Sequence, residues 1–289
     1  MVLCYWGIND VLTASTAIPH AECLCKTKGV SKVIFVSIER NLSDSHFSFV
    51  APDQIKLRAI KSTSLWFNLV TKLYDFITLP RQLKAIVQEN KVDCMVAIGT
   101  MAGSLAQKVH LLTKVPYYIS FCEPHASYML DTKVWKWYDP RYIFQKSWEE
   151  KQLNSAAGLL IVAENYKQVV KSSVCSPNRK VFVVRNAVDK RRFSFSSIDR
   201  EVQRRRYTIP SSGIVGIYVG KYGGLYYEDE AFHIYQKCFN LIPDFRLIIL
   251  SPKSTESINS KLVKHSIDLS KVFIASVPHH EVSHYLSAA

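Results

Sequence analysis

The sequence lacks any apolar run of the length that a transmembrane helix requires. The run at residues 156–163, AAGLLIVA, is one of the longest, whereas a helix that crosses a bilayer needs about 20 apolar residues. The first residues, MVLCYWGIND, carry no basic residue ahead of their apolar ones, so they form no signal-peptide pattern and instead predict a strand. With 10 glycines and 11 prolines among 289 residues, the chain has too little of either for a disordered or fibrous protein. The composition predicts a folded, soluble protein long enough for two domains.

The sequence also has no well-formed metal-binding pattern. Its seven cysteines are scattered, odd in number and without C-x-x-C spacing, which predicts reduced, mostly buried thiols. His280, Glu281 and His284 match the zinc-protease pattern H-E-x-x-H. Only five residues follow His284, however, and the third zinc ligand of such proteases lies downstream. The segment carries an ordinary apolar helical stripe, so we expect a core-facing helix and no metal.

Acidic residues are in deficit, with 24 Asp and Glu against 37 Lys and Arg and a formal net charge of +13. This excess favours polyanionic partners: nucleic acid, an anionic membrane surface or a phosphate-bearing ligand. The densest basic runs, residues 190–192 and 204–206, have no zinc knuckle, helix-turn-helix or RNP pattern beside them. Such runs are most often solvated surface. We therefore expect no nucleic-acid partner, and a basic nucleic-acid-binding protein stays an alternative.

Apolar runs typical of buried strands alternate with helix-length segments. Strands are predicted at residues 2–8, 32–38, 92–98, 116–121, 159–163, 180–184, 214–219, 246–251 and 271–275. Helices are predicted at residues 16–28, 65–90 with a break at Pro80, up to about 112 after the glycines at 99 and 103, 228–240, 256–265 and at the end of the chain. Buried strands separated by helices predict parallel sheets with right-handed crossovers. We expect two α/β units joined by the basic, Ser-rich stretch 190–212, which has little apolar periodicity and is predicted to be a linker.

Open parallel sheets bind ligands at the carboxyl ends of their strands. In the first unit, this rule selects Asn9, Ser15, Thr16, Gly99, Thr100, Glu123 and His125. In the second unit, it selects Gly220, Lys221, Gly223 and Gly224. With two sheets, a cleft between the domains is the expected ligand site.

Several stretches in order along the chain match one family. They are NSAAGLLIVAENYKQVVKSSVCSPNRKVFVVRNAVDKRRF (154–193), IYVGKYGG (217–224), IPDFRLIIL (242–250) and VFIASVPHHEVSHYLSAA (272–289). Together they resemble the family 4 glycosyltransferases of GT-B fold. The resemblance implies an α/β chain of two Rossmann-like parallel-sheet domains, the second incomplete. It implies an acceptor-side domain at 1–189, the linker at 190–212 and a donor-binding domain at 213–289.

The same resemblance implies a retaining glycosyltransferase of polysaccharide or glycoconjugate biosynthesis. Such an enzyme moves a sugar from a nucleoside diphosphate to a glycan or lipid-linked acceptor, without a metal or other cofactor. The implied location is cytoplasmic, with peripheral contact to the inner face of the membrane. Segment 65–77, LWFNLVTKLYDFI, is interpreted either as a membrane-contacting patch or as a well-packed core helix.

The resemblance also assigns roles to the candidate residues. His125 matches the family's cleft histidine and is the catalytic candidate. Lys221 stands where the family has a phosphate-binding arginine, and the glycines at 220, 223 and 224 would let the backbone approach the donor diphosphate. The acceptor or cleft candidates are Asn9, Ser15, Thr16, Gly99, Thr100 and Glu123.

Some family features are not recognisable in this sequence. Ala187 stands where the family has glycine. The second phosphate-binding lysine is not recognisable in YGGLYYEDEAF. The E-x7-E segment that contacts the donor sugar would lie beyond Ala289. A truncated or inactive family member is therefore the second alternative.

Overall fold

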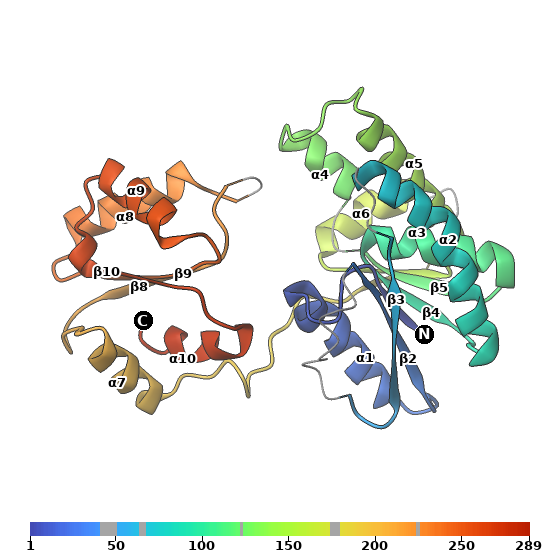
Figure 1. The fold of residues 1–289 in the computed structure, drawn as a ribbon, viewed down its shortest axis with the longest axis horizontal. Helices are drawn as coiled ribbons and strands as arrows, with labels where there is room; N and C mark the ends of the chain where they lie inside the picture. The colour runs from blue at the N-terminus through green and yellow to red at the C-terminus, as the bar shows by residue number, and fades with distance from the viewer. Residues whose placement is uncertain (41–50, 64–67, 122–123, 174–179, 224–225) are drawn as a thin grey trace. The chain divides into compact units, whose positions relative to one another are not determined.

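The chain folds into two compact units, described here from a computed structural model (Figure 1). Unit 1 is Met1–Asn186 and unit 2 is Ala187–Ala289. The structure describes residues 1–40, 51–63, 68–121, 124–173, 180–223 and 226–289. Each unit contains one parallel β-sheet with helices on both faces. The predicted α/β class with two Rossmann-like parallel sheets is therefore confirmed.

The sheet of unit 1 has seven strands, which pair in parallel in the order β3-β2-β1-β4-β5-β6-β7. The strands are β1 (Val2–Cys4), β2 (Val33–Glu39), β3 (Ile55–Lys61), β4 (Met95–Ile98), β5 (Tyr117–Phe121), β6 (Gly158–Ile161) and β7 (Lys180–Val183). From β1 the chain first builds toward one edge of the sheet and then, from β4, toward the other. The order therefore reverses between β1 and β4, and such a switch point is where open parallel sheets place their ligands.

Helices cover both faces of this sheet because its strands are apolar on both faces. The helical segments are the π-helix η1 (Thr13–Ala17), α1 (Ile18–Cys25), α2 (Asn68–Glu89), α3 (Gly99–Thr113), α4 (His125–Asp131), α5 (Pro140–Ser155) and α6 (Glu164–Ser173). Alternate residues of β1 enter different cores. Leu3 packs in the cluster that includes α2 and α3, whereas Val2 and Cys4 pack in the cluster that includes α1.

Unit 2 has a smaller parallel sheet in the order β10-β9-β8. Its elements are α7 (Ser197–Arg206), β8 (Val215–Val219), α8 (Asp229–Leu241), β9 (Arg246–Leu250), α9 (Thr255–Lys264), η2 (Leu269–Lys271), β10 (Val272–Ala275), η3 (His279–Glu281) and α10 (Val282–Leu286). Helices α8 and α9 cover one face of the sheet, and α7 and α10 cover the other (Figure 1).

The structure corrects the predicted linker, because part of the stretch 190–212 is helix α7. The hydroxyl of Ser196 caps this helix by accepting a hydrogen bond from the Asp199 N–H at 3.1 Å. Helix α7 packs beside α10 through polar contacts, which apolar periodicity does not report. The strand predicted at residues 2–8 is also shorter in the structure, since β1 ends at Cys4.

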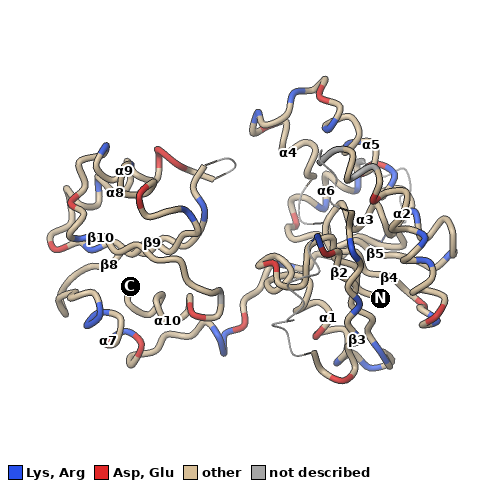
Figure 2. The backbone as a smooth tube through the Cα atoms, viewed as in Figure 1, with Lys and Arg blue, Asp and Glu red and all other residues tan. Residues whose placement is uncertain are grey.

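Arginines of α7, whose backbone positions are blue in Figure 2, bind backbone carbonyls within unit 2. Arg204 is only 9% exposed. It donates to the carbonyls of Ala288 at 3.1 Å, Pro210 at 2.9 Å, Ser211 at 3.2 Å and Gly213 at 3.0 Å. Because these bonds occupy the guanidinium, the basic run 204–206 is not entirely the solvated surface that the sequence predicts.

The described residues test two further predictions. The helices that the structure describes include none with both the length and the apolarity needed to cross a bilayer. The described cysteines, which are Cys4, Cys23, Cys25, Cys94 and Cys238, are free thiols. Only Cys4 and Cys25 among them are buried, whereas Cys94 and Cys238 are half-buried and Cys23 is exposed, so the prediction of mostly buried thiols is not confirmed for the described cysteines.

Candidate functional site

The loop after β1 and the start of α3 meet at the switch point of the unit 1 sheet. Gly99 opens α3 with φ at +80°, a left-handed value that favours glycine. A Cβ at Gly99 would lie 3.4 Å from the Trp6 ring of the loop after β1. The structure thus brings together two of the loops that the strand-end rule selects.

Glu39, at the end of β2, fixes the loop that carries Asn9. Its Oε1 accepts hydrogen bonds from the Ile8 N–H at 2.8 Å and from the Ser37 hydroxyl. A Cβ at Gly7 would lie only 2.6 Å from Glu39 Oε2, so the carboxylate occupies the space that a side chain would need. Beside it is a hollow of about 460 Å³. Its lining includes Tyr5, Trp6, Asn9, Asp10, Glu39 and Arg40.

Three other candidates near this loop form hydrogen bonds within the protein. The hydroxyls of Ser15 and Thr16 both donate to the Leu12 carbonyl. The Thr100 carbonyl accepts from Gln152 Nε2 at 3.0 Å. These contacts hold the local helices, and they leave the ligand-binding roles of Ser15, Thr16 and Thr100 as predictions.

A buried carboxylate links three elements at the same edge. Asp75 of α2 accepts hydrogen bonds from the Tyr5 hydroxyl and the Ser62 hydroxyl, each at 2.7 Å, through its Oδ2. Asp75 Oδ1 is buried without a hydrogen-bond partner among the described residues. Burial, followed by the hydrogen bond to Asp75, raises the pKa of Tyr5, so the phenol stays protonated at neutral pH.

His125 is the first residue of α4, beyond the end of β5. Its ring lies edge-on to the Trp135 ring, with centroids 5.5 Å apart. The buried Glu149 of α5 accepts hydrogen bonds from the Ala126 N–H at 3.0 Å and from Gln145 Nε2 at 2.8 Å. Burial raises the pKa of Glu149, and the hydrogen bonds and the nearby His125 offset part of that rise. Glu149 therefore fixes the backbone position at which His125 begins α4.

The turn after β8 carries the candidates of unit 2. The Gly220 N–H donates to the Leu250 carbonyl at 3.0 Å, which joins this turn to the end of β9. Gly220 has φ at +153° and Gly223 has φ at +79°, both in the region that favours glycine. The Tyr218 hydroxyl donates to the Lys221 carbonyl at 2.6 Å. The side chain of Lys221 is exposed, so it is free to meet an anion at this edge.

A second lysine lies at the same edge, after β9. Lys253 Nζ is 3.1 Å from Glu228 Oε1, and this hydrogen bond holds the pKa of Glu228 below its usual range. Lys261 also approaches Glu228 at 3.7 Å and pairs with Asp229 at 2.8 Å. Because these carboxylates stand at the start of α8, they already supply negative charge to its positive end. An anion bound at this edge would therefore accept hydrogen bonds from backbone N–H groups of the turn and from the lysine side chains.

The remaining candidates are placed as follows. Glu123 and Gly224 lie outside the described residues. His280 and His284 do not share one regular helix, because η3 ends at Glu281 and α10 begins after it. His284 Nδ1 instead lies 2.9 Å from Asp199 Oδ2 of α7. Among the described residues, no three His, Cys, Asp or Glu side chains gather closely enough to hold a metal.

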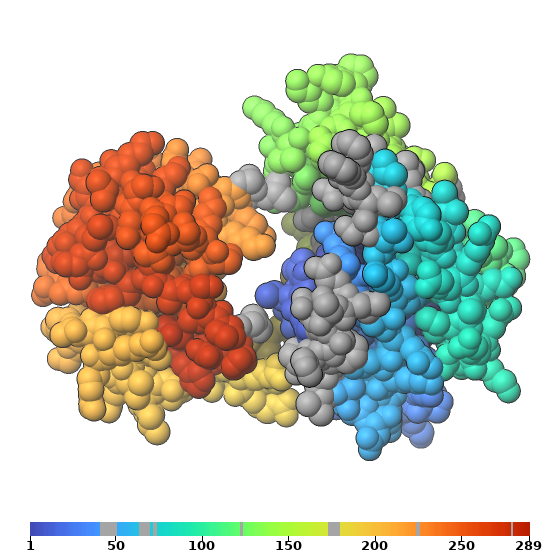
Figure 3. All heavy atoms as spheres, viewed as in Figure 1, coloured from blue at the N-terminus to red at the C-terminus, as the bar shows by residue number. Residues whose placement is uncertain are grey.

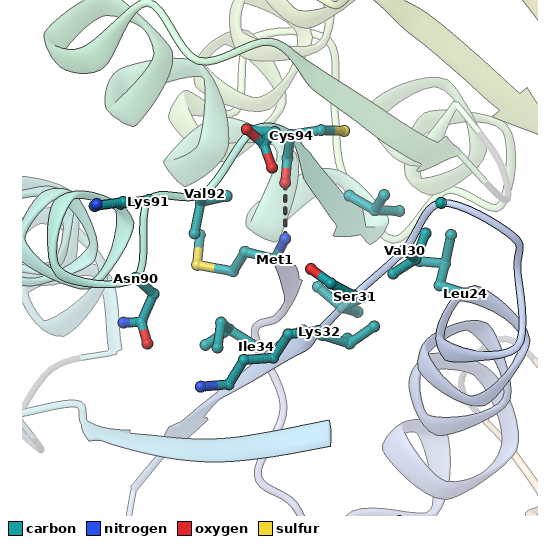
Figure 4. A pocket seen from close by; sticks show the side chains of 15 residues that line it. Met1, Leu24, Val30, Ser31, Lys32, Ile34, Asn90, Lys91, Val92 and Cys94 are labelled. Carbon is teal, nitrogen blue, oxygen red and sulfur yellow. Dashed lines mark hydrogen bonds between the residues drawn. The ribbon is translucent and has the colours of Figure 1, made fainter. Parts of the chain in front are cut away.

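The hollow drawn in Figure 4 lies at the opposite edge of the unit 1 sheet. It measures about 270 Å³ and is lined by the amino ends of β1, β2 and β4. Within it, the Met1 amine donates to the Cys94 carbonyl at 2.7 Å. Ligands of open parallel sheets bind at the carboxyl ends of strands, so we place no site here.

Four residues of this geometry, Glu39, Asp75, Glu149 and Lys253, were missed in the sequence. Glu39 and Lys253 each follow a predicted strand, so the strand-end rule, applied to every strand, would have selected both. Asp75 and Glu149 lie within helices, and only the tertiary structure brings them to the strand ends. No spacing in the sequence reports that placement.

Known structures identify the fold, although no protein-family model and no curated protein matches this sequence. HepE of Anabaena, solved with UDP and glucose, has a TM-score of 0.64 at 9% identity, over 100% of this chain and 72% of its own. WaaG, a glycosyltransferase involved in lipopolysaccharide biosynthesis, has a TM-score of 0.67 at 13% identity, over 100% and 72%. UDP-GlcNAc 2-epimerase from Neisseria meningitidis, bound to UDP-GlcNAc, has a TM-score of 0.62 at 14% identity, over 99% and 74%.

The chain has the GT-B fold. At these identities the likeness concerns the fold alone, and the GT-B neighbours include both a glycosyltransferase and an epimerase. Membership of family 4 stays a prediction. The chemistry must be argued from this chain's own residues.

Proposed function

We propose that the chain is a glycosyltransferase that binds a nucleoside diphosphate sugar through the unit 2 turn. The acceptor would be a hydroxyl of a glycan or lipid-linked molecule, and transfer would retain the anomeric configuration. In this reaction, the bond from the anomeric carbon to the diphosphate oxygen breaks and a bond to the acceptor oxygen forms. The acceptor proton leaves with the diphosphate. No metal or other cofactor is part of the proposal.

One observation carries the proposal. Two lysines lie at the carboxyl edge of the unit 2 sheet, each in the loop that follows one of two adjacent strands. Lys221 follows β8 and Lys253 follows β9, and the Gly220 N–H to Leu250 carbonyl bond joins the two loops. The glycine turn lets a backbone N–H approach a phosphate, and the lysines meet the charge that develops on the leaving diphosphate. Neighbours of this fold solved with UDP or a UDP-sugar support the choice of ligand.

Unit 1 would serve the acceptor and the reacting sugar. His125 begins α4 at a strand end and offers a ring nitrogen to a sugar hydroxyl. Asn9 and Glu39 line the hollow of about 460 Å³ at the switch point, where carboxylate and amide groups can bond acceptor hydroxyls. Contact of the enzyme with the inner face of a membrane would bring it to a lipid-linked acceptor.

A nucleotide-sugar epimerase is the second candidate, favoured by the fold likeness to UDP-GlcNAc 2-epimerase. The two reactions differ in their need for an acceptor. An epimerase converts UDP-GlcNAc when no acceptor is present, whereas a transferase requires an acceptor hydroxyl. Incubation with UDP-GlcNAc alone therefore separates them, because appearance of the 2-epimer would contradict the transferase.

Calorimetric titration of the full chain with UDP and with GDP tests the binding step. We expect saturable binding of one of them, weakened about tenfold by Lys221→Ala because one charge-assisted phosphate contact is lost. Lys237→Ala, which removes an exposed lysine of α8, is the matched control and should bind as the wild type does. Absence of binding to either nucleotide, with HepE as the positive control for UDP, would contradict the proposal.

A further inference from the structure

The carboxylate of Glu228 lies against the glycine turn that follows β8. A Cβ at Gly223 would lie 2.8 Å from Glu228 Oε2 and 3.6 Å from its Oε1, so the carboxylate fills the space beside the glycine backbone. Glu228 immediately precedes α8, but its side chain accepts no hydrogen bond from the N–H groups that open this helix. The carboxylate is therefore placed beside the turn and does not act as a side-chain cap of α8.

Two lysines from other elements hold the same carboxylate. Lys253 Nζ, in the loop after β9, lies 3.1 Å from Glu228 Oε1. Lys261 Nζ, of α9, lies 3.7 Å from the same oxygen. The hydrogen bond from Lys253 is the main cause that lowers the pKa of Glu228, so the carboxylate is ionised at neutral pH.

These surroundings are the ones that a bound phosphate requires. A glycine backbone, lysine side chains and the positive end of a helix are the usual partners of a phosphate in proteins. Helix α8 is long enough, at 13 residues, to carry such a positive end. In this chain, a carboxylate of the protein itself meets all three partners. Glu228 thus has the position of an anionic ligand.

The contact is also accessible to a competing anion. The side chains of Glu228 and Lys253 are each 36% exposed, and ion pairs with this exposure contribute little to stability. In the space-filling view, orange atoms of the segment that contains the turn and the start of α8 lie on the surface of unit 2 (Figure 3). A more highly charged anion can therefore displace the carboxylate without unfolding α8.

We propose that Glu228 is an internal counter-anion that a ligand phosphate must displace, and that it lowers the affinity of the turn for phosphates. In the ligand-free chain, the carboxylate neutralises Lys253 and covers the Gly223 backbone. When a diphosphate binds, the carboxylate moves into solvent, and the lysines meet the phosphate oxygens instead. The inference rests on the proposed function, because it concerns the regulation of the same turn.

Calorimetric titration of a Glu228→Gln variant tests this inference. The change keeps the size of the side chain and removes its charge. We expect about fivefold tighter binding of UDP or GDP, whichever binds the wild type, because the ligand no longer displaces an ion pair. Pyrophosphate, which needs no nucleoside site, should bind more tightly as well. Glu256→Gln is the matched control, since it removes an equal charge from an exposed residue in the first turn of α9. It should change each affinity less than twofold.

A double-mutant cycle with Lys253→Met tests the cause of the tighter binding. In the Lys253→Met background, Glu228→Gln should give a much smaller gain, because the lysine that the carboxylate occupies is absent. An equal gain in both backgrounds would mean that Glu228 acts only through the net charge of the protein, and it would overturn the inference. Glu228→Ala, measured alongside, should also bind pyrophosphate more tightly if the charge and not the packing of the side chain is responsible.

Failure of this inference differs from failure of the proposed function. The inference is wrong if Glu228→Gln tightens the binding of UDP, GDP and pyrophosphate no more than Glu256→Gln does. The proposed function is wrong, and the inference stands, if pyrophosphate binding tightens as expected while neither nucleotide binds any variant.

Discussion

The carboxyl edges of the two sheets differ in the charged side chains that they carry. In unit 1, Glu39, Asp75 and Glu149 place carboxylates at or beside this edge, and each accepts hydrogen bonds from the protein. In unit 2, the corresponding edge presents Lys221 and Lys253 on loops that follow adjacent strands, and Lys253 pairs there with Glu228. The topology is shared, so the difference resides in a few loop and helix residues.

This contrast shows how one architecture supports two recognition tasks. Carboxylates held by the protein keep further lone pairs for hydroxyl donors, which suits a sugar or other polyol. Lysines beside a glycine turn suit a diphosphate, because positive charge and backbone N–H groups meet anionic oxygens. Sites are grafted on folds in this way, and the proposed division between acceptor and donor follows from it.

The largest effect on stability should come from replacing Arg204, which donates hydrogen bonds to backbone carbonyls of unit 2. Arg204→Ala removes four hydrogen bonds to backbone carbonyls, and we expect a loss of about 3 kcal/mol in the free energy of unfolding of unit 2. Hydrogen exchange should show faster opening of β8 and β9 amides, with unit 1 unchanged. Arg205→Ala, an exposed change on the same helix, is the control. An effect of Arg204→Ala as small as this control would show that the network does not stabilise unit 2.

An intermediate effect is expected at the carboxylate edge of unit 1. Gly7→Ala would place a methyl group 2.6 Å from Glu39 Oε2, and we expect a destabilisation of about 2 kcal/mol. The clash depends on Glu39, so Gly7→Ala should be much better tolerated in a Glu39→Ala background, as a double-mutant cycle in thermal unfolding would show. Additive effects would mean that Glu39 does not hold the loop after β1.

The smallest effect should be the pH dependence of stability that Glu149 causes. Burial raises its folded pKa above the ordinary value of 4.5, so the native state binds this proton more tightly than the unfolded chain does. The resulting stability is full below about 4.5 and declines as pH rises through the folded pKa. Glu149→Gln has no carboxyl group to titrate at this position, so its stability does not decline with the wild type's. The melting temperature of the variant minus that of the wild type should therefore increase as pH rises through this range. The exposed Glu150→Gln is the matched control, and a difference for Glu149→Gln that stays as constant as the control's would contradict the prediction.

Much of the fold could be predicted from the sequence because buried parallel strands are continuous apolar runs. Strand β3 was missed, since it reads IKLRAIK and buries only its first residue and Ile60. Helix α7 was missed because its arginines bind distant carbonyls, and no apolar period marks such contacts. Helices α4, α5 and α6 were missed as well, so the sequence predicted the strands more completely than the helices.

The candidate site was predicted only where it follows the strands. The Asn9 loop, Gly99, His125 and the turn at Lys221 were found by the strand-end rule. Glu149 and Asp75 lie within helices, so their arrival at strand ends depends on how α5 and α2 pack. Secondary structure locates loops, but the donors and acceptors around them come from tertiary packing.

The central claim is that unit 2 holds a nucleoside diphosphate at its lysine-bearing edge. Hydrogen–deuterium exchange of the full chain with and without saturating UDP or GDP, whichever binds, tests it most directly. The account predicts slower exchange at residues 220–223 and 251–253, lost in Lys221→Ala. Slower exchange confined to the loops of unit 1, or no change in unit 2 at saturation, would contradict it.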